Sequence, residues 1–134
     1  MIALVWVWSK KKEVQMMSKQ KIKKAITSML KEVTNVNVYY HEAPLNTEYP
    51  YAVFNIRERY LTEGLYSNTL SVDVYALDIK TLDDLEDRLK MLNDITYSEN
   101  NLTFDIELNT VNTLKSESIY HLNMLFYLNN FWEG

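Results

Sequence analysis

The chain has 134 residues, of which 47% are hydrophobic and 13% aromatic, and this composition is typical of one globular domain rather than of a disordered chain. It contains no cysteine, which excludes disulfides, thiolate metal sites and thiol catalysis, and its two glycines leave little room for a glycine-rich phosphate-binding loop. The net charge of −4 is unevenly divided: residues 1–31 carry eight lysines and one acid, whereas the remainder carries six basic and seventeen acidic residues.

This charge division suggests how copies of the chain can associate. If folding leaves the two parts on different faces, the basic face of one copy can contact the acidic face of the next, and head-to-tail contacts of this kind close rings. The alternative is that both charged surfaces are simply solvated. Lysines in a chain that is acidic as a whole do not predict specific nucleic-acid binding.

Residues 2–8 are all apolar and precede a cluster of lysines. The run is too short for a membrane span, which takes about 20 apolar residues, and a secretory signal would carry its basic residues before the apolar run. Lys12-Glu13-Val14 can be encoded AAG-GAG-GTN, a bacterial ribosome-binding sequence, just upstream of Met16 and Met17. We therefore expect translation to start at Met16 or Met17, and residues 1–17 to be a flexible leader.

A helix is predicted to follow the leader, with Ser18 as its N-cap and Thr34 and Asn35 at its end. Apolar residues recur at helical spacing and predict its buried side, while lysines fall mainly elsewhere. These apolar residues are Ile22, Ile26, Met29, Leu30 and Val33. Alternation of apolar and polar residues then predicts a short strand over residues 36–40.

Two further alternating stretches, residues 51–57 and 70–76, predict an antiparallel hairpin. The loop between them, from Arg57 to Asn68, is longer than the usual 2 to 5 or so residues of a hairpin loop. It mixes charged residues with large apolar ones, so it either extends the hairpin as a protruding arm or becomes ordered only against a partner. The alternative is that its apolar side chains pair with each other across a longer hairpin.

Tyrosine and arginine are enriched at the energetic centres of protein interfaces, which makes this loop a candidate contact surface. The lysine side of the first helix is a second candidate. The predicted interface residues are Arg57, Glu58, Arg59, Tyr60, Leu61, Glu63, Leu65, Tyr66, Lys19, Lys23 and Lys24.

A second helix is predicted from Thr81, with Asp84 as its capping-box partner. Its buried stripe comprises Leu82, Leu85, Leu89 and Leu92, and its exposed side carries the pairs Asp84 with Arg88 and Glu86 with Lys90. Strands are predicted over residues 102–109 and 120–128, with a polar loop around residues 112–118.

The element order helix, three strands, helix, two strands predicts one α+β domain over residues 18–134. We expect a mainly antiparallel five-stranded sheet with both helices packed on one face, and a polar and aromatic second face that meets solvent or a partner.

No catalytic signature is present. The two histidines, His41 and His121, have no evident partners, and His121 is expected to point outward from the last strand. Asp73, Asp105 and Glu107 also fall on outward strand positions, where they could converge as the hard-cation site of a metal nuclease. The alternative is that these carboxylates form the solvated side of the sheet. We expect no enzymatic activity, no metal and no cofactor.

Several stretches resemble a known family. They are Val38-Tyr39-Tyr40, the Ala43-Pro44 connection, Tyr49-Pro50-Tyr51-Ala52-Val53-Phe54, the strand Leu70-Ser71-Val72-Asp73-Val74-Tyr75 and the leucine-striped helix that follows. Over residues 18–128 the chain is similar to the tail-completion proteins of long-tailed bacteriophages, also called tail-to-head joining or tail-terminator proteins.

The resemblance implies an α+β fold without enzymatic activity that caps the head-proximal end of the tail tube, typically as a hexameric ring, so that the tail can join the filled head. It implies three partners: further copies of the chain, the tail tube protein and the head-tail connector. We expect a monomer or weak oligomer before assembly, made in the host bacterial cytoplasm and then located in the virion, with no membrane association. The alternatives are a head-side connector or stopper protein, a divalent-metal nuclease and a small regulatory binding domain.

Overall fold

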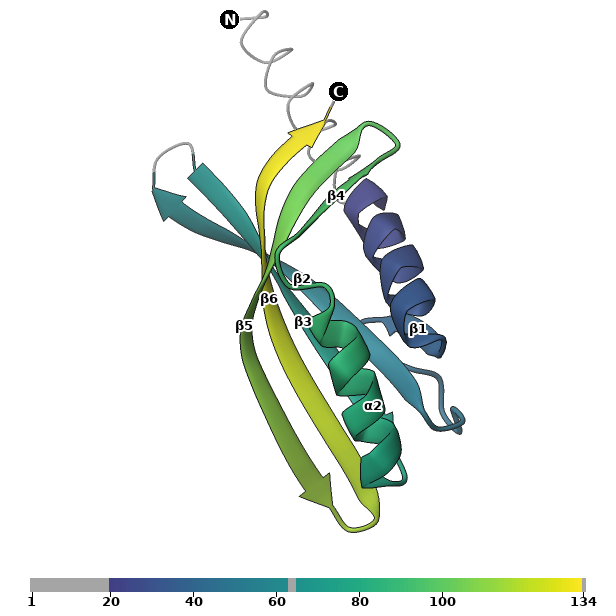
Figure 1. Ribbon diagram of the computed structural model, residues 1–134. Coiled ribbons are helices and arrows are strands. Elements are labelled where there is room, and N and C mark those ends of the chain that lie inside the picture. The colour runs from purple at the N-terminus through teal and green to yellow at the C-terminus, as the bar shows by residue number, and fades with distance from the viewer. Residues whose placement is uncertain (1–19, 63–64, 134) are drawn as a thin grey trace, which may run out of the picture.

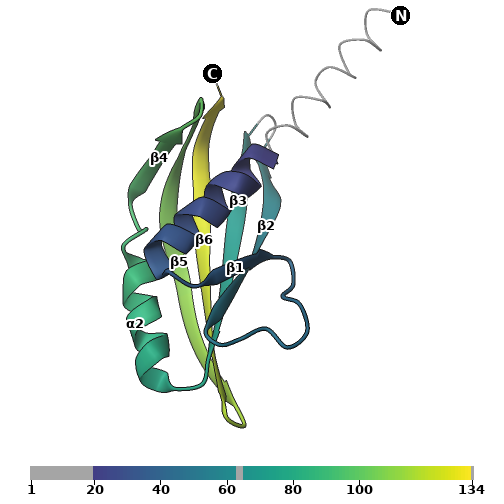
Figure 2. The ribbon, with the colours of Figure 1, turned by 90° about the vertical axis from the view of Figure 1, so that its right-hand side faces the viewer.

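The computed structural model describes residues 20–62 and 65–133, with backbone only at residues 59–62, 65–67 and 133. The described chain forms a curled sheet with two helices on one of its faces (Figure 1). A view turned by 90° shows both helices lying in front of the sheet (Figure 2). The predicted leader, residues 1–17, and the predicted cap Ser18 lie outside the described residues.

The elements follow one another in the order helix, three strands, helix, three strands. They are a helix over residues 20–34, β1 (Asn37–Tyr40), β2 (Tyr51–Thr62), β3 (Leu65–Ala76), α2 (Ile79–Lys90), β4 (Ile95–Glu99), β5 (Leu102–Ser116) and β6 (Ile119–Glu133). The sheet has six strands in the order β1-β2-β3-β6-β5-β4.

The predicted α+β class is therefore confirmed, whereas the predicted five-stranded, mainly antiparallel sheet is wrong in two respects. β1 runs parallel to β2, which makes the sheet mixed. β4 is a sixth strand, and it pairs with β5 in an antiparallel hairpin. The turn of that hairpin is Asn100-Asn101, in which both residues have positive φ, 52° and 63°. A two-residue turn with positive φ at both positions suits the twist of a hairpin, and asparagine tolerates it.

Strand pairing continues through both predicted loop segments, which confirms the extended-hairpin alternative for residues 57–68 and makes the polar loop predicted around residues 112–118 wrong. β2 and β3 stay paired as far as Thr62 and Leu65, so the stretch from Arg57 to Asn68 extends the hairpin. β5 and β6 stay paired as far as Ser116 and Ile119. Cross-strand hydrogen bonds in these long hairpins satisfy backbone groups that a loop would leave to water.

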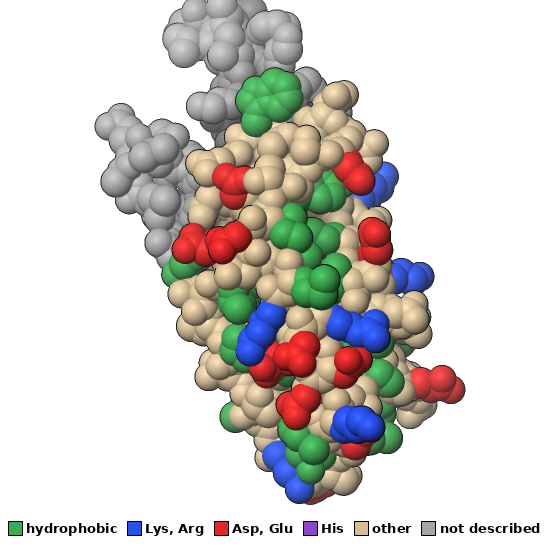
Figure 3. Space-filling model, in the orientation of Figure 1, with side chains coloured by type: hydrophobic (Ala, Val, Ile, Leu, Met, Phe, Trp, Pro, Cys, Tyr) green, Lys and Arg blue, Asp and Glu red, His purple; other side chains and the backbone are tan. Residues whose placement is uncertain are grey.

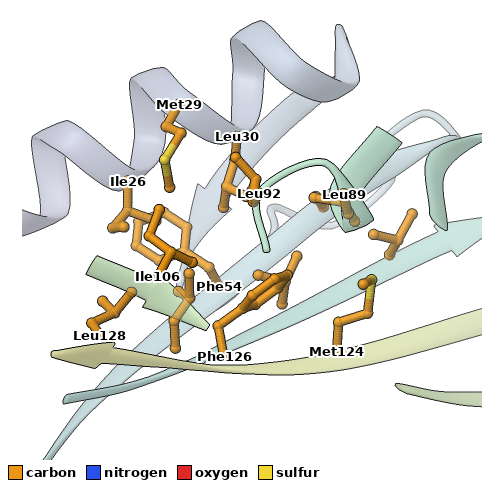
Figure 4. Packing of buried hydrophobic residues seen from close by; sticks show 14 of the residues in the cluster. Ile26, Met29, Leu30, Phe54, Leu89, Leu92, Ile106, Met124, Phe126 and Leu128 are labelled. Atoms are coloured by element: carbon orange, nitrogen blue, oxygen red, sulfur yellow. The ribbon is translucent and has the colours of Figure 1, made fainter. Parts of the chain in front are cut away.

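A single apolar core joins the helices to one face of the sheet. Ile26, Met29 and Leu30 of the first helix point toward Phe54 and Phe126 of the sheet (Figure 4). Leu82, Leu85, Leu89 and Leu92, the predicted stripe of the second helix, are all buried in the same cluster. The strands contribute every second residue to this core, which confirms the predicted assignment of faces.

The end of the first helix is fixed by two residues that the sequence also places there. Thr34 Oγ1 donates a hydrogen bond to the Leu30 carbonyl (2.6 Å), and Asn35 takes a left-handed conformation with φ 57°. Asparagine is one of the few residues that enter this region readily, so the helix stops and the chain turns into β1.

The second helix begins two residues earlier than predicted. Asp78, not Thr81, is its N-cap: an Asp78 carboxylate oxygen accepts a hydrogen bond from the Thr81 backbone N–H (2.8 Å), and the other oxygen accepts one from the Thr81 hydroxyl (2.9 Å). These bonds satisfy a free N–H of the first turn and lower the pKa of the Asp78 carboxyl group.

Replacing Asp78 with alanine should therefore lower the thermal unfolding midpoint, because the first turn loses its cap. Asp78→Asn is the matched control, since an asparagine oxygen can accept the same bond from the Thr81 N–H. Differential scanning calorimetry of the three proteins tests this. Equal midpoints for wild type and Asp78→Ala would show that the cap contributes nothing.

Candidate assembly surface

The hairpin of β2 and β3 projects beyond the rest of the sheet. Residues 59–67 are called the arm here. β3 pairs with β6 only between Asn68 and Ala76, so the described part of the arm has no strand paired with it on the β6 side. The arm diverges from the end of β6 (Figure 1). Arg57 and Glu58 lie exposed at its base.

The structure describes the predicted interface residues to different extents. Arg59, Tyr60, Leu61, Leu65 and Tyr66 are placed by their backbone in the arm, whereas Lys19 and Glu63 lie outside the described residues. Their role as an interface stays a prediction.

Lys23 connects the first helix to the base of the arm. Its ammonium group lies over the Tyr40 ring, 4.1 Å from the ring centroid, a cation–π contact of about 0.5–1 kcal/mol at such a partly exposed site. Lys23, Tyr40 and Glu58 line one hollow together with Ile22, Ile56 and Asn68. Lys24, the next residue of the helix, is exposed. The two predicted surfaces, the lysine side and the hairpin, are therefore adjacent at Lys23.

The face of the sheet opposite the helices, called the open face here, carries a row of stacked rings. Tyr51 stacks on Tyr75 with ring centroids 5.1 Å apart, and Tyr75 stacks on His121 at 4.5 Å. Tyr39 and Tyr49 contact the edge of the row at Tyr51. The row thus crosses four strands or their flanks, and it offers large aromatic area in a fixed arrangement.

A hydrogen-bond network supports the histidine of this row. His121 Nε2–H donates to Asp73 Oδ1 (2.7 Å), and Asn123 Nδ2 donates to the same oxygen (2.9 Å) and to Ser71 Oγ (3.1 Å). All four side chains are partly buried. The prediction that His121 points outward is confirmed, and its ring is held in place by Asp73.

Burial raises the pKa of Tyr75, and the negative charge of Asp73 raises it further. Burial also raises the pKa of Tyr51. Both phenols are therefore neutral at physiological pH. Interfaces are enriched in tyrosine and depleted of charge at their centres, so the open face suits a protein partner.

The three carboxylates of the predicted nuclease site do not converge. Asp73 of β3 lies opposite Asn123 of β6 in the strand register, and Asn123 lies opposite Asn112 of β5. Asp105 lies seven residues from Asn112 along β5, a distance of about 23 Å at 3.3 Å per residue. Within the part of the chain that the structure describes, no three acidic or histidine side chains lie close enough together to hold a metal ion.

Asp105 of β5 instead forms hydrogen bonds to both neighbouring strands, β4 and β6. Its carboxylate accepts hydrogen bonds from Thr96 Oγ1 of β4 (2.6 Å) and from Asn130 Nδ2 of β6 (2.7 Å). Asn130 has φ 57° where the pairing of β5 with β6 shifts register, which is the geometry of a β-bulge. The two hydrogen bonds lower the pKa of the Asp105 carboxyl group.

This lowered pKa predicts a pH-dependent contribution to stability. A carboxyl group whose pKa is lower in the folded than in the unfolded state contributes stability above its ordinary pKa of 3.8, and this is lost as the pH falls toward the folded value. The difference in unfolding free energy between wild type and Asp105→Asn should therefore shrink between about pH 6 and about pH 3. Urea unfolding across this range measures it, and a constant difference would contradict the assignment.

Sequence reasoning placed the outward residues of β3, β5 and β6 correctly but missed the ring row. The stacking depends on strand register, which sets Tyr51 opposite Tyr75 and Tyr75 opposite His121. The sequence offered one signal: β2, β3 and β6 each have a ring at an outward position near one end, namely Tyr51, Tyr75 and His121. The Lys23–Tyr40 contact had no signal of this kind, because it joins a helix to a strand edge.

The fold is similar to that of a known virion chain. A chain in the structure titled "Virion of native gene transfer agent (GTA) particle" superposes with a TM-score of 0.55 and 10% sequence identity, over 78% of this chain and 84% of that chain. At this identity the similarity shows a shared fold. No protein-family model matches the chain, and no curated protein matches it. Neither helix in the described residues has the length and apolar character needed to cross a membrane.

Proposed function

We propose that the chain is a structural protein of a virion, and that it closes the head-proximal end of a tail tube and joins the tail to the head. The observation that carries the virion role is the shared fold with a chain of the gene transfer agent virion, because it extends over most of both chains. The finer role comes from the sequence resemblance to tail-completion proteins, and the surfaces described above support it.

Joining a tube to a head requires contacts on more than one side of each subunit. The arm, the lysine side of the first helix and the open face supply three separate surfaces. In this proposal several copies form a ring, typically of six as in the family that the sequence resembles. One surface contacts the tail tube protein, and another contacts the connector of the head.

The proposal is for a protein without enzymatic activity. The separation of Asp73 from Asp105 speaks against the predicted nuclease site, since a two-metal or one-metal centre needs its carboxylates around a single ion. In this proposal Asp73 orders His121 and Asp105 ties three strands together, which gives both carboxylates a structural role.

Electron microscopy of particles made without this protein tests the proposal. The expected result is filled heads beside separate tails, with joining restored when the purified protein is added. Antibody labelling then locates the protein: label on isolated tails supports tail completion, and label on isolated heads indicates a head-side connector or stopper. Intact virions, or heads that never fill, would overturn the proposal.

A further inference from the structure

In the part of the sheet that the structure describes, β1 and β4 are the outermost strands, on opposite sides (Figure 2). β4, a strand of 5 residues, is outermost on one side. On the other side β1 has 4 residues and pairs only with Tyr51–Phe54, whereas β2 has 12 residues. Among the described residues, the rest of the outer edge of β2, from Asn55 to Thr62, has no strand beside it.

Backbone groups on this part of β2 are directed outward. The His41 N–H donates to the Phe54 carbonyl (2.9 Å), which shows that Phe54 presents its backbone toward the β1 side. Backbone direction alternates along a strand, so Ile56 and Glu58 present their N–H and C=O groups to the same side. An edge with outward-facing groups is a template for another strand. A groove lined by Tyr40, His41, Asn55, Ile56, Arg57 and Glu58 runs beside it.

The two edges lie in surroundings of opposite charge. Lys23 and Arg57 line hollows beside the free edge of β2, together with the acid Glu58. Residues 91–114, which include β4, contain four acidic residues and no lysine or arginine. Three of those acids, Asp94, Asp105 and Glu107, line one hollow beside β4.

The surface over α2 does not supply this negative charge. Lysine and arginine side chains are interspersed with acidic ones over the half of the molecule that holds α2 (Figure 3). Arg88 pairs with Asp84 at 3.1 Å and Lys90 pairs with Glu86 at 2.9 Å, as the sequence predicts. The charge over α2 is therefore mixed, whereas residues 91–114 carry acidic residues and no basic one.

We propose that the β4 edge of one copy pairs with the free β2 edge of the next copy, so that the sheet continues from subunit to subunit. Contact between two β2 edges or two β4 edges would bring like charges together, whereas contact between unlike edges brings opposite charges together. The backbone of each edge supplies the hydrogen bonds, and the charges select the partner. The free part of β2 is longer than β4, so it accommodates the whole of that strand.

Pairing of unlike edges is a heterologous contact, which generates a closed ring when the rotation between subunits closes and a filament when it does not. The inference rests on the proposed function, because a cap around a tube needs several copies. It goes further by naming the two strands that join them. It also leaves the open face and the tip of the arm free for the tube and the head.

Cross-linking of cysteine variants tests the contact, and the native chain has no cysteine that would interfere. Glu58→Cys places a thiol on the β2 edge and Glu99→Cys places one on the β4 edge; both positions are exposed and both lie on the helix side of the sheet. With a short bismaleimide, neither single variant should form covalent dimers, and an equimolar mixture of the two should. The double variant should form a ladder of oligomers.

Three outcomes would overturn the inference: dimers from Glu58→Cys alone, dimers from Glu99→Cys alone, or no dimers from the mixture up to the solubility limit. Glu58→Pro is a second test, since it removes an outward N–H without removing a bond to β3; it should abolish oligomers, whereas Glu58→Ala should not. These experiments use purified protein only. Failure to cross-link with intact restoration of tail joining would reject the contact and leave the proposed function standing.

Discussion

Replacing Phe126 with alanine should lower the free energy of unfolding by about 3–5 kcal/mol. Phe126 has no exposed surface and lies in the middle of β6, where it faces the core between the two helices and the sheet (Figure 4). Its partners in the neighbouring strands are Leu70 of β3 and Leu108 of β5, so the ring is enclosed on both sides. Removing it leaves a cavity that these strands cannot close without breaking their pairing.

The matched control is Leu114→Ala in the adjacent strand β5. Leu114 is 58% exposed on the open face, so its truncation removes little buried area and should change the unfolding free energy by less than about 0.5 kcal/mol. Urea unfolding followed by tryptophan fluorescence and circular dichroism measures both variants. A loss at Phe126 as small as that at Leu114 would mean that the core described here is not the main source of stability.

The parts of the fold that the sequence predicted are those governed by local periodicity. Ile26 and Leu30 recur at helical spacing, and both are fully buried. In the same way, Val72 and Val74 alternate with Ser71 and Asp73, and the valines face the core. A side chain's face follows from its place in a repeat of 3.6 or 2 residues, so the helices and five of the six strands follow from the sequence.

The parts that the sequence did not predict depend on what lies beside a strand. Ile95 is exposed and only Tyr97 of β4 packs against the core, so this strand lacks the apolar alternation that marks the others. Its best signal is the Asn100-Asn101 turn. The parallel pairing of β1 had no local signal either, because β1 reaches β2 through a connection, residues 41–50, and not through a tight turn.

At the candidate surface, too, local periodicity predicted some features and the pairing of strands decided the others. Periodicity correctly placed Asp73, Asp105 and His121 on the outward side of their strands. Register decided which of them meet: it set Asp73 beside His121 and placed Asp105 beside Thr96 and Asn130. Residues on the same face of the sheet therefore need not lie close together. The distance between Asp73 and Asp105 follows only from the pairing of β3 with β6 and of β6 with β5.

The arm should be necessary for joining tails to heads, and the domain should fold without it. Residues 59–67 lie beyond Asn68, the last residue of β3 that pairs with β6. The remaining residues of β2 and β3 are paired in the sheet without them. Arg59 and Ser67 are directly opposite each other, and by the alternation along β2 they form a hydrogen-bonded pair, so a two-residue Asn-Gly turn can replace residues 60–66 without a change of register. The shortened protein should unfold at nearly the same temperature as wild type.

In the assay that adds purified protein to separate heads and tails, the shortened protein should join no more particles than buffer does. The matched control shortens the other long hairpin, with Asn-Gly in place of residues 115–120 between the paired residues Leu114 and His121, and it should keep its joining activity. Both variants lose the tip of a hairpin, so a defect confined to the arm variant identifies a contact rather than a general loss of structure. Full joining by the arm variant would exclude residues 60–66 as an assembly surface, including their part of the β2 edge, and leave the open face, the β4 edge and the β2 edge from Asn55 to Arg59 to make the contacts.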